Sequence, residues 1–83
     1  MELSKLEEEL GKAQRVLLRD HGFAASVKAF VGLSPGVLVV EVRGADVRTD
    51  LGFVIEIVDS IGRDLSVLIV ERFVKELFDG QNV

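Results

Sequence analysis

The sequence predicts a small α+β domain, a two-layer sandwich whose helices cover mainly one face of a three-stranded sheet. Three observations indicate this class. Leucines recur at helical spacing near the N-terminus, a valine-rich run follows a Pro-Gly turn, and hydrophobic residues make up 48% of the 83 residues. A chain of this length and apolar content can form one core, so we expect a single domain over residues 1–83.

A first helix is predicted over residues 2–21. Its apolar positions are spaced by three and four residues, as one face of a helix requires, and they are Leu3, Leu6, Leu10, Ala13 and Leu17. Gly22 is placed to close the helix with a left-handed residue. Gly11 lies inside the helix and lowers its propensity. It is either tolerated there or marks the close approach of another backbone.

Two strands are predicted next, joined by Ser34-Pro35-Gly36. The proline presets one turn position, and the glycine accepts the positive φ that a type II turn needs. Residues 23–31 alternate in polarity, and residues 37–43 contain four valines. The side chains of Leu38, Val40 and Val42 share one strand face and should meet the core. Two such strands predict an antiparallel hairpin.

The C-terminal half predicts a second helix, a third strand and a last helix. Apolar residues at 51, 54, 55, 58 and 61 fit a helical stripe, although residues 53–58 are β-branched enough to form a strand instead. Residues 67–70 are typical of a buried strand, and residues 73–78 of a short amphipathic helix. The predicted order is α-β-β-α-β-α, with a mixed sheet because strands that flank a helix run parallel.

This order of elements over residues 4–71 resembles three small modules: type II KH-like domains of RNA-binding proteins, the N-terminal domain of the ribosome maturation factor RimP, and the C-terminal domain of NifU-like iron–sulfur scaffolds. A KH-like relationship implies nucleic-acid binding through a GxxG loop. A NifU-like relationship implies a Cys-x-x-Cys pair. The segment from Gly44 to Gly52 lacks GxxG spacing and the chain has no cysteine, so the resemblance assigns no site residue.

Composition excludes several classes of function. The absence of cysteine removes disulfides, zinc–cysteine sites, iron–sulfur ligation and thiol catalysis. The net charge of −4 arises in residues 44–83, which carry four basic and eight acidic side chains, and it disfavours a nucleic-acid partner. No apolar run approaches the roughly 20 residues of a membrane span, and the N-terminus does not have the pattern of a signal peptide. We expect a cytoplasmic protein without a cofactor.

Candidate catalytic and metal-binding residues are few. His21 is the single histidine, and no nucleophile or base is near it in sequence, so a structural role at the helix end is expected. The consecutive acids of Glu7-Glu8-Glu9 predict a solvated helix face. No cluster of metal ligands is apparent. The sequence therefore predicts a protein that is not an enzyme.

One candidate binding site is basic. It could hold a phosphate or a nucleic-acid backbone at the N-terminus of the predicted helix 51–61. Its residues are Lys28, Arg43 and Arg48. The alternative is that these charges solubilise a sheet edge.

The leading functional hypothesis is a non-catalytic interaction or assembly module that self-associates as a homodimer or binds another protein. The reason is an excess of apolar side chains over what one small subunit can cover. The candidate contact residues are Leu10, Leu17, Phe53, Ile57, Phe73 and Phe78. The alternative hypothesis is a KH-like nucleic-acid- or ribosome-associated binding protein that uses the basic residues.

Overall fold

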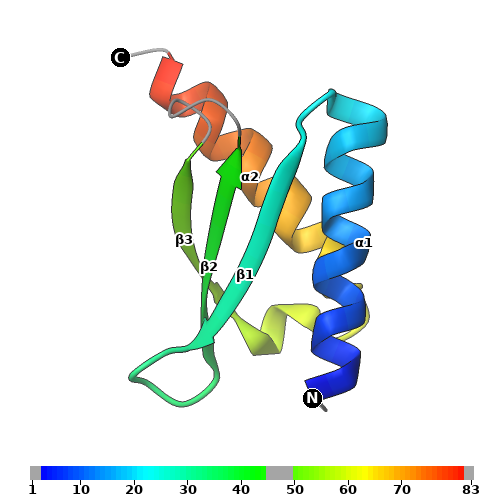
Figure 1. The fold of residues 1–83 in the computed structure, drawn as a ribbon. Helices are drawn as coiled ribbons and strands as arrows, with labels where there is room; N and C mark the ends of the chain where they lie inside the picture. The colour runs from blue at the N-terminus through cyan, green and yellow to red at the C-terminus, as the bar shows by residue number, and fades with distance from the viewer. Residues whose placement is uncertain (1–2, 45–49, 82–83) are drawn as a thin grey trace.

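A computed structural model describes residues 3–44 and 50–81, which form two helices and a three-stranded antiparallel sheet (Figure 1). The elements are α1 (Leu3–His21), β1 (Ala25–Val31), β2 (Val37–Gly44), β3 (Leu51–Glu56), a short 3₁₀ helix η2 (Ile57–Ser60) and α2 (Leu65–Gln81). The α+β class and the number of strands are confirmed. The predicted order is wrong, because the three strands follow one another without an intervening helix.

Helix α1 forms and ends as its sequence predicts. Ala13 and Leu17 lie fully buried on its inner face. Gly22 has φ 72°, its N–H donates to the Leu18 carbonyl at 3.2 Å, and the Phe23 N–H donates to the Leu17 carbonyl at 3.0 Å. A Cβ added at Gly11 would meet only the Arg15 side chain, at 3.4 Å, so this glycine is tolerated and marks no approach by another backbone.

Strands β1 and β2 form the predicted antiparallel hairpin. Val27 pairs with Val42 and Ala29 with Val40, and the turn between the strands contains Gly36 at φ 76°. Leu38, Val40 and Val42 are buried, as the alternation predicts. The long valine-rich strand β2 is the centre of the sheet, with β1 on one side and β3 on the other.

The predicted helix over residues 51–61 is wrong, because its first six residues form strand β3. Phe53 pairs with Val40 and Ile55 with Leu38, so the inward positions 51, 53 and 55 continue the apolar face of β2. Pairing with β2 satisfies backbone groups and buries these side chains together, which outweighs the local helical stripe. The chain then turns through η2, where the Ile57 N–H donates to the Gly36 carbonyl at 2.7 Å.

The predicted strand at residues 67–70 is also wrong, because it lies inside the single long helix α2. Leu65, Ile69 and Phe73, spaced four residues apart, are all buried. The Asp64 carbonyl accepts hydrogen bonds from Val67 and Leu68 as the helix begins. Without a strand here no parallel crossover exists, so the sheet is antiparallel and the predicted mixed sheet is wrong.

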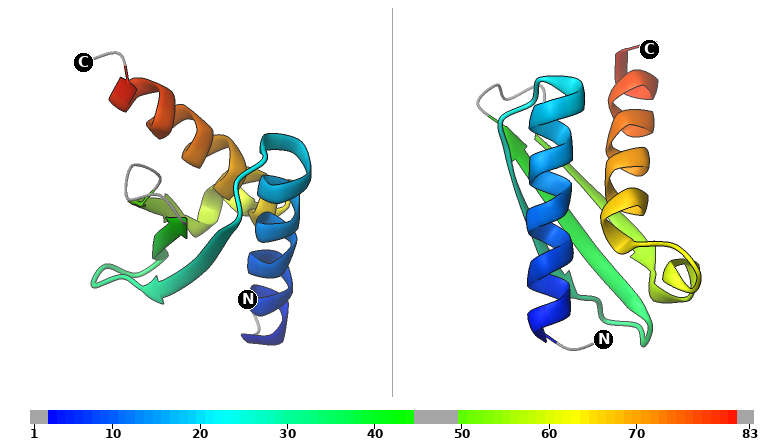
Figure 2. Two further views of the ribbon diagram at one scale, coloured as in Figure 1. Left: turned by 45° about the horizontal axis from the view of Figure 1, so that its top comes forward. Right: turned by 90° about the vertical axis from the view of Figure 1, so that its right-hand side faces the viewer.

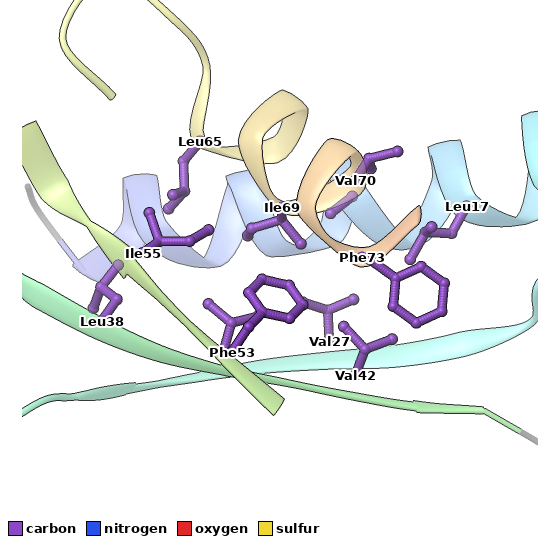
Figure 3. Packing of buried hydrophobic residues seen from close by; sticks show 12 residues of the cluster. Leu17, Val27, Leu38, Val42, Phe53, Ile55, Leu65, Ile69, Val70 and Phe73 are labelled. Carbon is purple, nitrogen blue, oxygen red and sulfur yellow. The ribbon is translucent and has the colours of Figure 1, made fainter. Parts of the chain in front are cut away.

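Both helices pack against the same face of the sheet, as the sequence predicts (Figure 2). The core fills the space between the layers and joins all the main elements (Figure 3). Its largest fully buried side chain is Phe73, whose ring lies edge-on to Phe23 at 5.6 Å between centroids. Within residues 3–44 and 50–81, neither helix combines the length and the apolar character that crossing a membrane requires.

Gly32 is required where the hairpin begins. Its N–H donates to the Val37 carbonyl at 2.9 Å, and a Cβ built on it would lie 2.9 Å from that same oxygen. We expect Gly32→Ala to destabilise the fold by about 1–3 kcal/mol in chemical denaturation. The contrasting change Gly11→Ala should stabilise it by up to about 1 kcal/mol. Equal effects of the two changes would contradict the close approach at Gly32.

Candidate functional site

The face of the sheet opposite the helices carries a line of apolar side chains. Phe30, Val39 and Val54 lie side by side across the three strands, since Phe30 pairs with Val39 and Val39 pairs with Val54. We call these three residues the apolar row. Phe30 is 51% exposed and Val54 is 46% exposed. Since this face lies away from both helices, the apolar row is available to a partner.

Charged side chains lie beside the apolar row on the same face. Lys28 is directly opposite Glu41, and the Nε of Arg43 lies 3.8 Å from Glu41 Oε2. On the other side of the row, Glu56 pairs with Val37 across β2 and β3. The face is therefore mixed in sign, with an apolar middle and a charged surround. This arrangement is typical of a protein-binding surface and differs from the uniformly positive surface that nucleic acid requires.

The free edge of β3 opens onto a groove between the sheet and α2. We call it the edge groove, and its volume is about 490 Å³. It is lined by Val54, Ile55, Glu56, Asp59, Leu68, Glu71, Arg72 and Lys75. Arg72 partly covers the edge: its Nη1 lies 3.4 Å from the Val54 carbonyl oxygen and its guanidinium lies 5.9 Å from the centre of the Phe53 ring.

The opposite edge of the sheet is covered in a similar way. The side-chain oxygen of Gln14, on α1, accepts a hydrogen bond from the Val27 N–H of β1 at 2.9 Å. This hydrogen bond, at 2.9 Å, is shorter than the 3.4 Å hydrogen bond from Arg72 to the Val54 carbonyl of β3. Edge strands with open backbone groups can pair with another chain, and such side chains limit that pairing. The β3 edge is therefore the more accessible of the two.

A buried carboxylate joins the two helices. Glu9 is 1% exposed. Its Oε1 accepts hydrogen bonds from the Ser66 N–H at 3.3 Å and the Ser66 hydroxyl at 3.4 Å, and its Oε2 lies 3.1 Å from Lys12 Nζ. Burial opposes ionisation of Glu9, but the Lys12 ammonium beside it and the hydrogen bond from the Ser66 N–H outweigh this, so the pKa of Glu9 lies below its ordinary value. Glu9 thus caps the start of α2.

The predicted solvated face at Glu7-Glu8-Glu9 is consequently wrong for Glu9. Its role in holding the helices together has no signal in the local sequence, because Ser66 lies far along the chain. Glu8 does lie at the surface, and its Oε1 is 3.6 Å from Lys12 Nζ. His21 is exposed and stacks on Phe23 at 6.5 Å between ring centres.

Most of the predicted self-association residues lie in or against the core instead. Leu17, Phe53 and Phe73 are buried, and Leu10 and Ile57 pack against them partly buried. Phe78 alone among the six is exposed, at 60%. The reason is the changed topology: with 51–56 in the sheet, Phe53 faces the helices. Phe30 and Val54, the exposed members of the apolar row, were not predicted as contact residues.

The predicted basic site is only partly assembled. Lys28 and Arg43 both lie on the uncovered face, on neighbouring strands, with Glu41 beside each of them. Arg48 lies outside the described residues. The helix N-terminus that was to hold a phosphate is absent from residues 50–56, where β3 forms and Asp50 Oδ1 instead accepts the Gly44 N–H at 3.0 Å.

Among residues 3–44 and 50–81, no three acidic or histidine side chains gather where a metal ion could bind. Comparison of the chain with protein-family models, with curated proteins and with solved structures finds no match. The open sheet face and the free β3 edge are the candidate functional site, because they combine exposed apolar side chains with backbone groups at a strand edge.

Proposed function

We propose that the protein is a small non-catalytic interaction module that self-associates, with a homodimer as its simplest form. The observation that carries this proposal is the apolar row, which crosses the helix-free face and ends at the open edge of β3. Exposed apolar side chains on a regular surface next to unpaired backbone groups favour association with another protein chain. The cytoplasmic location expected from the sequence stays a prediction.

Static light scattering of the full chain tests the proposal. We expect a mass approaching twice the 9.1 kDa of one chain as the concentration rises to tens of micromolar. Val54→Asp should return the protein to a monomer, because it places a charge where the apolar row meets the edge. The matched change Ser26→Asp, at the far end of the same face, should leave the mass unchanged. A wild-type monomer at every concentration would overturn the proposal.

Nucleic-acid binding remains the alternative hypothesis from the sequence. Lys28 and Arg43 share the open face, but Glu41 lies opposite Lys28 and 3.8 Å from Arg43. The uncovered face therefore offers less net positive charge than a phosphate backbone requires, since each phosphate contact needs a basic side chain or an N–H donor. The mixed charges favour a protein partner.

A further inference from the structure

We propose that the partner is a second copy of this chain and that the two copies pair through their β3 strands, antiparallel, about a two-fold axis at Val54. The inference rests on the proposed function, and it specifies which surface the two copies share. The result would be one continuous six-stranded sheet with all four helices on the same side. A two-fold contact requires a surface that is complementary to itself, and the edge of β3 has this property.

The backbone of β3 provides the first evidence. Because the Val54 carbonyl oxygen lies within 3.4 Å of Arg72, it points away from β2 and toward the free edge. Hydrogen-bonding direction alternates along an antiparallel strand, so Gly52 and Glu56 present their N–H and C=O groups to the same edge. Three alternate residues of β3, from its second to its last, thus offer donors and acceptors at the spacing that another antiparallel strand requires.

The position of the axis follows from the side chains. With the axis at Val54, Gly52 of one copy lies opposite Glu56 of the other. Glu56 of each copy then faces Gly52, which has no side chain. Two glutamates directly opposite each other would repel and destabilise the pair. The two Val54 side chains meet on the open face, so pairing covers the exposed end of each apolar row.

Charge along the edge groove supports the same arrangement. Helix α2 runs in the direction opposite to β3 (Figure 1). Arg72 contacts Val54, and Lys75 follows it about one turn later along α2, so Lys75 lies toward the start of the strand. Glu56 is the last residue of β3, and Asp59 follows it in η2. A two-fold axis at Val54 places the Lys75 end of the edge groove in one copy next to the Glu56 end of the edge groove in the other copy. The basic end of one groove, at Lys75, therefore faces the acidic end of the other, at Glu56 and Asp59.

Arg72 is the group that pairing must displace. Its hydrogen bond to the Val54 carbonyl is long, at 3.4 Å, and its other contact with β3 is the guanidinium 5.9 Å from the centre of the Phe53 ring. Glu76 Oε1 accepts a second hydrogen bond from its Nε at 2.9 Å, and the side chain is 44% exposed. The guanidinium can thus leave the strand edge while it keeps its partner on α2.

Cysteine cross-linking tests the position of the axis, because the chain has no cysteine of its own. Residues directly opposite each other in an antiparallel hydrogen-bonded pair have Cα atoms about 5.5 Å apart, within the range of a disulfide. We expect Val54→Cys to form a covalent dimer under mild oxidation. The control Lys28→Cys, on the same face but on β1, should remain unlinked. Equal cross-linking of both variants would indicate random encounters and overturn the pairing.

Charge reversal tests the complementary ends. Glu56→Lys and Lys75→Glu each bring like charges together at both ends of the interface, and each should weaken self-association about tenfold. A mixture of the two variants should largely restore it, because position 56 of each chain then again faces an opposite charge at position 75 of the other. Glu7→Lys, on the exposed surface of α1, is the control and should have no effect.

The outcomes separate this inference from the proposed function. If the wild type is a dimer but Val54→Cys stays unlinked and the mixed variants do not recombine, the β3 pairing is wrong while self-association stands. If the wild type is a monomer at all concentrations, both fail. Selective cross-linking at Val54 together with recovery in the mixture supports the pairing.

Discussion

Phe73→Ala should lower the free energy of unfolding by about 3–5 kcal/mol, the largest effect of any substitution considered. Phe73 is the largest fully buried side chain of the core, and its ring points from α2 toward the sheet (Figure 3). Its truncation leaves a cavity and removes the edge-on contact with Phe23. Urea denaturation followed by circular dichroism measures the change.

The matched control is Phe78→Ala, the same substitution five residues further along α2. Phe78 is 60% exposed, so its removal should change stability by no more than about 0.5 kcal/mol. Similar losses for the two variants would mean that α2 does not present the face to the core that the structure assigns to it.

Glu9→Ala should destabilise the fold by about 2–4 kcal/mol, since it removes a buried acceptor and leaves the Ser66 N–H and hydroxyl without their partner. The neighbouring Glu7→Ala, at the surface of the same helix, should have little effect. Thermal and urea unfolding of both variants measure the difference. If Glu7→Ala and Glu9→Ala are equally stable, Glu9 does not hold the start of α2.

The same carboxylate should make stability depend on pH. Burial opposes its ionisation, but Lys12 and the Ser66 N–H keep the pKa of Glu9 in the folded chain below its ordinary value of 4.5. The unfolded chain therefore takes up this proton at a higher pH than the folded chain does. The stability that Glu9 contributes is complete above the unfolded pKa and is lost as the pH falls through the folded pKa. Glu9→Gln should remove this part of the acid dependence.

The N-terminal half of the fold could be predicted because its signals are local. Residues close in sequence determine the apolar face of α1, the left-handed Gly22 that ends this helix and the turn at Gly36. Residues 51–61 could not be assigned in this way, since their apolar positions fit both a helix and a strand. The strand is favoured because β2 pairs with β1 along only one edge, and residues 51–56 pair with its other edge. The run at 67–70 was predicted as a strand because it is short and continuously apolar, a pattern that a buried helix segment such as α2 shares.

The candidate site was harder to predict than the fold. Phe30, Val39 and Val54 become neighbours only through the strand register, which the sequence does not specify by itself. Glu9 finds its partner at Ser66, 57 residues along the chain. Phe53 and Phe73 were expected at a surface because an incorrect topology left them without a core to enter.

Hydrogen exchange at the two sheet edges, measured over a range of protein concentrations, tests the pairing of β3 most directly. The Val54 N–H should exchange slowly at high concentration and quickly on dilution, because a second copy supplies its acceptor. The Val27 N–H should show no such dependence, because Gln14 of the same chain accepts its hydrogen bond. Exchange at Val54 that does not change with concentration would contradict the proposed association.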